Sequence, residues 1–460
     1  MSQEAQGQRA TWSGKLAFVL SAAASAVGLG AMWRFPYLAA KYGGGTFLFM
    51  YLVFVFTIGV SLLLLEHTLG RKTGLSAIGA FKSFGKQYSF IGILASAVPF
   101  IIVPYYCVIG GWTTKYMVSY LTDGAAAMAD GGDYFSNYIA DPGMSSIFLL
   151  IFVVATCFVV WRGVNDGIEK ANLIMMPLLI VVSAALAIYV LTMPGAIDGI
   201  GYYLIPDVSK FSPELVIAAL GQTFFTLSLA MGIMVTYGSY VSKKEVMTTS
   251  AVQIAATTFA VSLLAGFMII PSAFAALGGG DAVAQNAGPS LMYIILPQVF
   301  NNMGSVGTII GFIFFILVIF AALTSSISLV ETCVSVICDG AHMSRSKSIA
   351  IVAVFTAVVA LIVNLGYNAL DFIQPLGEGS SILDFLDFIS NSVLMPIVAI
   401  LTCVFVGWII KPKAFIDEIR LNTPFKLADV WTVVIKYIAP VCIAIILVAY
   451  VAQTFGIIKL

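Results

Sequence analysis

Long runs of apolar residues alternate with shorter polar segments along most of the chain. A helix of about 17 to 25 residues crosses the roughly 30 Å hydrocarbon core of a bilayer. Eleven runs reach this length, at about 14–38, 44–70, 90–121, 145–161, 168–193, 214–240, 247–277, 304–338, 347–365, 382–410 and 429–455. The longer polar segments are predicted loops at 122–144, 194–213, 278–303 and 366–381. The pattern predicts an all-α polytopic membrane protein with eleven transmembrane helices.

The composition agrees with a membrane protein and excludes two other classes. Hydrophobic residues make up 60% of the 460 residues and charged residues only 10%, whereas a soluble domain carries about 25% charged residues. The 22 basic and 22 acidic residues balance, and no basic stripe is interleaved with aromatic residues, so nucleic-acid binding is not expected. The polar N-terminus lacks the pattern of a cleaved signal peptide, so we expect the first apolar helix to be retained.

The residue types that usually carry catalysis or bind transition metals are scarce. All six cysteines lie in apolar segments and none forms a CxxC pair, which is typical of buried, inert thiols. His67 and His342 are the only histidines, so neither a zinc cluster nor a Ser-His-Asp set can be assembled. We therefore do not expect an enzyme.

Basic residues gather on one side of the predicted bilayer if the eleven spans alternate. That side carries Arg9, Lys15, Arg71, Lys72, Lys82, Lys86, Arg162, Lys170, Lys243, Lys244, Arg345, Lys347, Lys411, Lys413, Arg420 and Lys426. Short basic loops remain in the cytoplasm, so the N-terminus is predicted to be cytoplasmic. An odd number of spans then places the C-terminus outside. We expect a multi-pass protein of the cell (inner) membrane.

Two predicted spans contain helix breakers at corresponding places. The first reads SAVGLGAMWRFP and the sixth reads FFTLSLAMG. Small residues often serve only for close helix packing in membranes. Breaks five helices apart instead favour unwound helices that face a binding cavity between two inverted repeats. We predict a single transporter domain over 1–460, with repeats at about 11–193 and 214–410 and one additional helix at about 429–455.

Three motifs carry a resemblance to a known family. They are SAVGLGAMWRFPYLAAKYGGG at 25–45, GQTFFTLSLAMG at 221–232 and FAALTSSIS at 320–328. They resemble the neurotransmitter:sodium symporter family, in particular its short eleven-helix bacterial amino-acid transporters. The resemblance implies a sodium-coupled secondary symporter that imports a neutral, apolar amino acid by alternating access.

The resemblance also implies a sodium site between the first and eighth spans. Its ligands are the carbonyls of Ala24, Val27 and Ala321 and the hydroxyls of Thr324 and Ser325. Neutral oxygens of this kind suit a hard cation, although a Thr-Ser pair alone is more typical of helix packing. Gly167 and Pro177 resemble the ends of a stretch that unwinds to admit water to this ion; a simple proline kink is the alternative.

The implied substrate site lies beside the two breaks. Amides near Leu29 and Gly30 and the Tyr106 hydroxyl would receive a carboxylate, because a helix N-terminus favours anions. The ammonium would meet the carbonyls of Ala26, Phe225 and Thr226 and the Ser228 hydroxyl. Gly28 supports an amino acid, since amine-selecting relatives carry aspartate there. The side-chain subsite would be formed by Ile102, Tyr106, Phe225, Met231, Ser325 and Leu329.

Charged residues near the breaks resemble the two gates of the family. Arg34 and Asp387 resemble the outer pair. Arg9, Trp12 and Asp339 resemble the inner gate, which Tyr240 would support. Charged residues beside membrane spans are costly and usually functional, although ordinary interfacial charge is the alternative for Arg9 and Asp339.

The sequence departs from the family at the site where most relatives bind a second sodium ion beside the substrate carboxylate. Most relatives place asparagine in the first and seventh spans; here the positions hold Ala31 and either Thr257 or Thr258. Chloride-dependent relatives use a serine nearby, for which Ser262 is the candidate beside Tyr51, Gln222 and Thr226, and chloride-independent relatives use an acid that is missing here. We predict one sodium per substrate and no strict need for chloride.

Two other functions remain open from the sequence alone. The same fold can carry another small organic zwitterion or amine. It can also bind a substrate without moving it, as a sensor. Residues of both proposed gates are present, which argues against an open channel.

Overall fold

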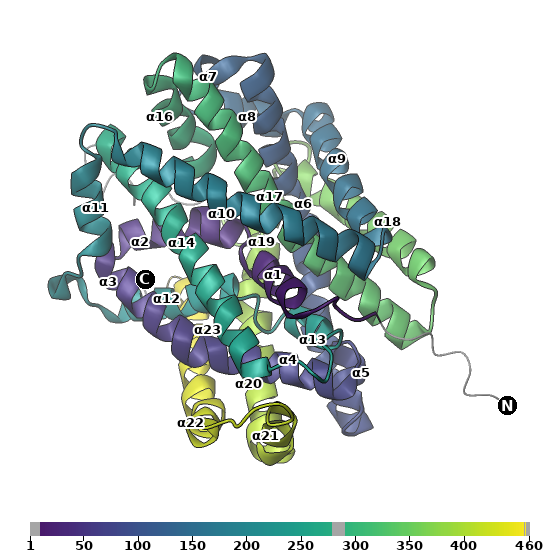
Figure 1. The fold of residues 1–460 in the computed structure, drawn as a ribbon. Coiled ribbons are helices and arrows are strands. Elements are labelled where there is room, and N and C mark those ends of the chain that lie inside the picture. The colour runs from purple at the N-terminus through teal and green to yellow at the C-terminus, as the bar shows by residue number, and fades with distance from the viewer. Residues whose placement is uncertain (1–9, 278–289, 455, 457–460) are drawn as a thin grey trace.

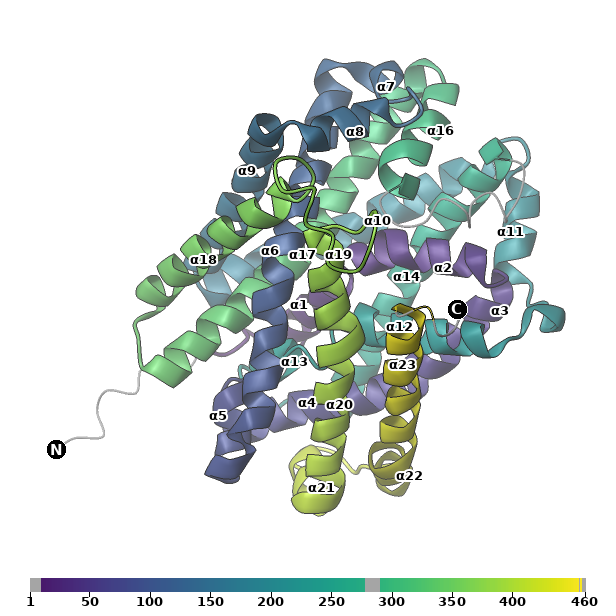
Figure 2. The same cartoon turned by 180° about the vertical axis from the view of Figure 1, so that it is seen from behind.

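The structure is a computed structural model that describes residues 10–277, 290–454 and 456. The described chain is helical and contains no strand, apart from an isolated antiparallel bridge between Gly44 and Pro206. Helices α7, α8 and α16 lie at one end of the molecule, and α5 and α21 lie at the opposite end (Figure 1, Figure 2). Helices α6 and α17 pack along each other between these ends.

The first half of the chain contains the following elements, in order: α1 Lys15–Ala26, η1 Gly30–Arg34, α2 Phe35–Lys41, α3 Gly45–Phe54, η2 Val55–Gly59, α4 Val60–Thr73, α5 Ala77–Lys82, η3 Lys86–Tyr88, α6 Ser89–Thr122, α7 Gly124–Ala127, α8 Asp133–Ala140, α9 Pro142–Trp161, η4 Val164–Glu169, α10 Lys170–Leu191 and α11 Ala196–Leu204. Helix α9 shows why these boundaries fall where they do. The Asp141 side chain accepts the N–H groups of Gly143 and Met144, which caps the helix three residues before the predicted start.

The second half begins with η5 Val208–Lys210 and continues with α12 Pro213–Thr226, α13 Ile233–Gly238, α14 Met247–Leu277, η6 Leu291–Ile295, α16 Leu296–Asn302, α17 Ser305–Ala341, α18 Arg345–Leu365, α19 Ile382–Asp387, η7 Phe388–Leu394, α20 Met395–Val404, η8 Phe405–Ile409, α21 Lys413–Ile419, α22 Ala428–Val433, η9 Val434–Ile438 and α23 Ala439–Thr454. Ser381 and Asp384 form a reciprocal capping box at the start of α19. This cap fixes the register of the helix that ends in Asp387.

Within the described residues, nine continuous helices are long and apolar enough to cross a membrane, and one bent pair raises the number to ten. The bent pair joins Lys15–Ala26 to Gly30–Lys41 at 66°. The predicted sixth span is divided into α12, of 14 residues, and α13, of 6 residues. The expected boundaries agree with the observed helices to within a few residues. The number eleven stays a prediction, because it counts α12 and α13 as one span.

The predicted loops are more ordered than the sequence analysis expected. Segment 122–144 contains α7 and α8, segment 194–213 contains α11 and η5, and the described part of 278–303 contains η6 and α16. Tyr203 on α11 is fully buried, and its hydroxyl donates to the Leu263 carbonyl at 3.1 Å. Such tertiary contacts stabilise helices that are too short to form alone, so the prediction of plain loops was wrong there.

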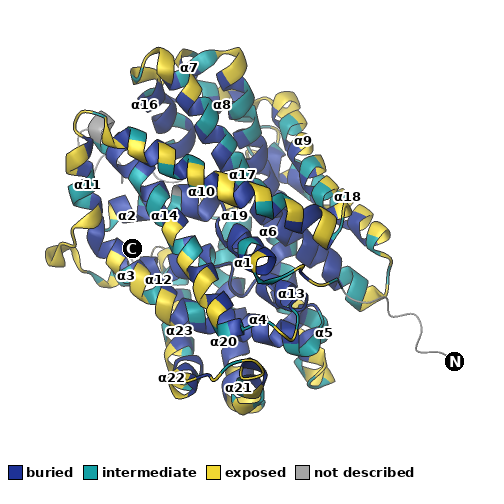
Figure 3. Cartoon of the chain, viewed as in Figure 1, coloured by how far each residue is buried: buried dark blue, intermediate teal, exposed yellow. Residues whose placement is uncertain are grey.

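Large apolar side chains face outward along α9, α10 and α18. Figure 3 shows the exposed positions in yellow along these outer helices. They include Ile147, Val154, Phe158, Ile174, Val181, Ile188, Val354 and Val358. An apolar outer surface of this kind is what lipid-facing helices require.

Candidate functional site

Two interrupted helices meet near the middle of the molecule. Helix α1 ends at Ala26, and the chain resumes helical geometry at Gly30. Helix α12 ends at Thr226, and α13 begins only at Ile233. Carbonyls at the end of α1 and amides at the start of the next element therefore lack helical partners. The structure thus contains both predicted breaks.

The second break has a strained backbone. Ser228, Ala230 and Gly232 adopt left-handed conformations with φ of 51°, 61° and 70°, which costs about 1–2 kcal/mol for a residue with a side chain. The buried Glu66 of α4 accepts the Ala230 N–H at 2.7 Å. This hydrogen bond holds the loop in a shape that its residues would not adopt alone.

A small cavity of about 30 Å³ lies between the two breaks and α17. Its lining residues are Ser25, Ala26, Gly28, Gly30, Ile102, Tyr106, Phe225, Thr226, Ser228, Met231, Ile233, Ser325 and Leu329. Every predicted substrate residue except Leu29 is in this set. The structure adds Ser25, Gly28 and Ile233, which lie in or beside the motifs. No charged side chain lines the cavity within the described part of the chain.

Hydrogen-bonding groups converge on this cavity. The Leu29 N–H donates to the Tyr106 hydroxyl at 3.0 Å, so Leu29 contributes through its backbone. The hydroxyls of Ser325 and Ser228 both donate to the Ser25 carbonyl, at 2.8 and 3.2 Å. A Cβ atom at Gly28 would lie 2.6 Å from the Tyr106 hydroxyl oxygen. A side chain at position 28 would therefore close the cavity.

The predicted sodium ligands are buried where α1 packs against α17. Ala24, Val27, Ala321 and Thr324 are fully buried, and Ser325 is nearly so. The Thr324 hydroxyl donates to the Phe320 and Ala321 carbonyls at 2.9 and 3.1 Å. A hydroxyl that donates to a carbonyl keeps lone pairs for a cation. The set consists of neutral oxygens, which fits a hard monovalent ion.

A larger cavity of about 370 Å³, here called the vestibule, lies against the small one. It is lined by Leu29, Arg34, Tyr37, Tyr105, Tyr106, Ile109, Trp112, Phe225, Tyr367, Leu383, Asp384, Asp387 and Asn391. Phe225 and Tyr106 line both cavities and therefore divide them. The Arg34 guanidinium lies 5.0 Å from the centre of the Phe225 ring. Asp387 accepts from the Tyr105 hydroxyl at 3.2 Å and from the Asn391 amide at 2.5 Å.

A second closure, here called the Trp12 closure, lies at the end of the molecule that carries α5 and α21. The Trp12 N–H donates to the Tyr240 carbonyl at 3.0 Å, and its indole N–H donates to the Tyr237 carbonyl at 3.1 Å. The indole ring also contacts both tyrosine rings edge to face. The structure thus brings together Trp12 and Tyr240 as predicted. Asp339 accepts the Ser76 N–H at 2.7 Å, and Arg9 lies outside the described residues.

Three buried acids near this closure were assigned no role from the sequence. Glu331 of α17 accepts the Tyr240 hydroxyl at 2.7 Å and pairs with Arg345 at 2.5 Å. Glu169 accepts from the N–H and the hydroxyl of Ser13. Glu418 pairs with Arg71 at 2.9 Å. For Glu331 and Glu169 the available signal was an acid in or beside an apolar helix, which costs enough to require a partner. Glu418 lies in a polar segment and gave no such signal.

The stretch between Gly167 and Pro177 is helical, through η4 and α10. The predicted unwinding of this stretch is therefore not present in this conformation. A Cβ atom at Gly167 would overlap the Val159 carbonyl. The glycine thus permits close contact with the end of α9.

The four candidates for a chloride site, Tyr51, Gln222, Thr226 and Ser262, are joined in two pairs by hydrogen bonds. The Gln222 amide donates to the Gly30 carbonyl at 2.9 Å and to the Thr226 hydroxyl at 2.7 Å. The hydroxyls of Tyr51 and Ser262 lie 3.3 Å apart. The Thr258 hydroxyl instead donates to the Ile254 carbonyl of its own helix at 2.9 Å.

Comparison with known proteins supplies an independent line of evidence. The family model described as the sodium:neurotransmitter symporter family matches residues 9–137 and 127–457. An "Uncharacterized sodium-dependent transporter" of Haemophilus influenzae is 33% identical over 467 residues, which cover 97% of this chain and 99% of the relative. Another sodium-dependent transporter, from Bacillus subtilis, is 34% identical over 95% of this chain and 96% of its own.

A solved structure has the same fold. The crystal structure of MhsT in complex with L-phenylalanine matches with a TM-score of 0.87 and 36% sequence identity. The match covers 96% of this chain and all of MhsT.

Proposed function

The chain belongs to the sodium:neurotransmitter symporter family, a family of multi-pass membrane transporters rather than enzymes, and we propose that it imports a neutral, apolar amino acid with sodium. One observation carries this proposal: two opposed helix breaks enclose a cavity without a charged side chain. Both charges of a zwitterion would then be met by backbone groups and hydroxyls. MhsT, which resembles the chain over its whole length, binds L-phenylalanine.

The two ends of the proposed substrate would be held by opposite backbone groups. The amides of Leu29 and Gly30 and the Tyr106 hydroxyl would receive the carboxylate, because free N–H groups after a helix break favour an anion. The carbonyls of Ala26, Phe225 and Thr226 and the Ser228 hydroxyl would receive the ammonium. Ile102, Met231 and Leu329 would contact the side chain, assisted by Ser325. Phe225 lines both the small cavity and the vestibule, so its ring would move aside to admit the substrate from the vestibule.

Sodium is the co-transported ion of the family, and we assign one ion to the site of Ala24, Val27, Ala321, Thr324 and Ser325. Such an ion would join the end of α1 to the middle of α17. The second family site would have only Thr226, the short hydroxyl of a threonine at 257 or 258 and backbone oxygens, because Ala31 offers no side-chain oxygen and threonine is shorter than the asparagine of most relatives. An ion with too few ligands does not recover its dehydration cost. We therefore propose no second sodium and no strict need for chloride.

The transport cycle would alternate between the two closures. Arg34, Phe225 and Asp387 would form the outer gate, and Trp12, Tyr240, Asp339 and Arg9 the inner one. We propose eleven spans in a single domain over 1–460, with α12 and α13 forming the broken sixth span. The repeats would extend over about 11–193 and 214–410, followed by the helix at about 429–455. In this arrangement the N-terminus is cytoplasmic and the C-terminus extracytoplasmic, in the cell (inner) membrane.

Uptake into proteoliposomes tests this proposal. Labelled neutral amino acids are offered with and without an inward sodium gradient, and counterflow is measured at equal sodium. We expect sodium-driven uptake of an apolar amino acid. Binding without counterflow would instead indicate a substrate sensor. Uptake restricted to compounds without a carboxylate would indicate an amine carrier.

A further inference from the structure

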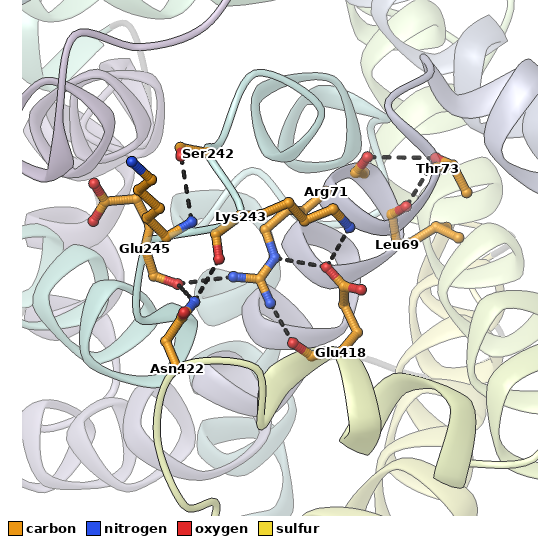
Figure 4. A network of polar contacts seen from close by, with 10 residues as sticks. Leu69, Arg71, Thr73, Ser242, Lys243, Glu245, Glu418 and Asn422 are labelled. Atoms are coloured by element: carbon orange, nitrogen blue, oxygen red, sulfur yellow. Dashed lines mark hydrogen bonds and ion pairs between the residues drawn. The ribbon is translucent and has the colours of Figure 1, made fainter.

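Arg71 at the end of α4 is a fully buried cation with partners far away in the sequence. Its Nε donates to Glu418 Oε1 at 2.9 Å, and the side chains of Arg71 and Glu418 are 0% and 8% exposed. Its other nitrogens donate to the Glu418 carbonyl and, at 2.8 Å, to the Glu245 carbonyl. Figure 4 shows the guanidinium between these two segments. One side chain thus joins α4, the segment after α13, and α21.

Other contacts reinforce the same junction. Lys243 Nζ lies 2.7 Å from Glu418 Oε1. The Asn422 amide donates to the carbonyls of Lys243 and Glu245, at 2.5 and 3.1 Å. We call Arg71, Lys243, Glu245, Glu418 and Asn422 the Glu418 cluster. It holds the segment 243–245 against α21 from two directions.

On one side of the cluster, α4 and α13 form a single packed unit. A Cβ atom at Gly70 would overlap the Val235 carbonyl, and one at Gly238 would lie 2.5 Å from the His67 carbonyl. The two backbones are therefore in direct contact. Helix α13 and the residues after it supply the Tyr237 and Tyr240 carbonyls that bind Trp12. The Glu418 cluster lies only a few residues further along this chain segment.

On its other side, α21 is anchored to different helices. Phe415 of α21 stacks on Phe84 at 6.2 Å between ring centres. Phe84 and Tyr88, which precede α6, also contact Phe405, the first residue of η8 after α20. The cluster therefore connects the α4–α13 unit, which holds Trp12, to a unit made of α21 with the ends of α6 and α20.

We infer that Glu418 is a positioning residue that keeps the Trp12 closure shut by fastening the α4–α13 unit to α21. Separating a buried ion pair leaves an uncompensated charge, so the closure opens only when Glu418 releases Arg71. This inference rests on the proposed alternating access. It adds a connection outside the gate residues already named.

Hydrogen–deuterium exchange measures this closure directly, because the Trp12 N–H is itself bonded to Tyr240. The full-length protein is placed in nanodiscs with sodium, and exchange is followed in peptides that contain Trp12 and in peptides from α17. The test variant is Arg71→Met with Glu418→Met, because replacing both charges with apolar residues often preserves stability. We expect exchange at Trp12 to become about tenfold faster through local opening, with α17 unchanged.

Two further variants separate a specific role from general damage. Asp166→Asn removes an exposed ion pair with Lys170, where both side chains are 65% exposed, and should leave exchange at Trp12 unchanged. Lys243→Met keeps the Arg71–Glu418 pair and should accelerate exchange by about threefold.

Unchanged exchange in the folded Met-Met variant overturns the inference. If that variant fails to fold, unchanged exchange in Lys243→Met overturns it. Absence of sodium-driven uptake by the wild type would contradict the proposed function separately.

Discussion

The two ends of the proposed substrate path are closed by different kinds of contact. On the vestibule side, Arg34 lies over the Phe225 ring, and a 370 Å³ cavity begins directly beyond it. On the other side, Trp12 is held by two hydrogen bonds to backbone carbonyls, and Tyr240 is fastened in turn to Glu331. The vestibule side is closed by a layer of side chains. The Trp12 closure also contains hydrogen bonds to backbone carbonyls and a buried ion pair. We therefore expect the closed protein to open more easily toward the vestibule.

Removing the Trp12 side chain should open the Trp12 closure. Trp12→Ala deletes a buried indole, and truncations of this type cost about 3–5 kcal/mol. The balance between closed and open forms should shift by more than about a hundredfold. Sodium-driven uptake in proteoliposomes should then be almost abolished.

The matched control is Trp161→Ala, because Trp161 is 58% exposed at the end of α9. That variant should keep wild-type uptake. Wild-type uptake in Trp12→Ala would show that this contact is not part of the transport cycle.

Tyr106 lies on the partition between the cavities, so it tests the region between the two closures. Tyr106→Phe leaves a buried carboxylate short of one hydrogen bond, which costs about 1–3 kcal/mol. Substrate affinity should fall by about ten- to a hundredfold, as measured by isothermal titration with sodium. Tyr105→Phe, which removes the hydroxyl bonded to Asp387, should change affinity less. Retained affinity in Tyr106→Phe would favour a substrate without a carboxylate.

Sodium should act mainly on the Trp12 side, because two of its proposed ligands, Ala24 and Val27, lie at the end of α1, the helix that follows Trp12. Thr324→Val with Ser325→Ala removes two of five proposed ligands, so the sodium concentration for half-maximal binding should rise about tenfold or more. Sodium should also slow exchange at the Trp12 amide in the wild type but not in this variant. Ser326→Ala is the control, since Ser326 contacts Thr156 instead. An unchanged sodium dependence in the double variant would place the ion elsewhere.

A conservative substitution of Arg34, on the vestibule side, should change substrate release only slightly. Arg34→Lys keeps the charge but loses the planar guanidinium over Phe225, and an exposed cation–π contact contributes about 0.5–1 kcal/mol. Bound substrate should dissociate about two- to fivefold faster, as measured by release of labelled amino acid. A change comparable with that of Trp12→Ala would show that the two closures do not differ as described.

The smallest expected effect concerns the number of sodium ions that are transported with each substrate. Uptake plotted against sodium should give a Hill slope near one and should persist when chloride is replaced by gluconate. Ala31→Asn with Thr258→Asn should raise the slope by supplying oxygens to the second site. A wild-type slope near two, with two charges moved per zwitterion, would contradict the single-ion proposal.

The spans and the lining of the central cavity were predictable from the sequence, because both depend on features of short, continuous segments. Apolar length defines a membrane helix, and the breakers near Gly28 and Ser228 lie in the same short segments that supply the cavity walls. The start of α9 was missed by three residues because Asp141 caps it, and the order in α11 depends on burial of Tyr203. The Arg71–Glu418 pair was not predictable, because its members are 347 positions apart and Glu418 lies in a polar segment that predicts only surface exposure.

The strained break after α12 has an evolutionary consequence. The residues Leu227, Leu229, Ala230 and Met231 are strong helix formers, so within this stretch only a few residues, Ser228 and Gly232 among them, oppose a continuous helix. The unwound form persists because distant groups such as Glu66 hold it. We therefore expect that mutational drift would first repair the helix rather than unfold the protein, leaving descendants that keep the architecture but have lost the ability to carry cargo.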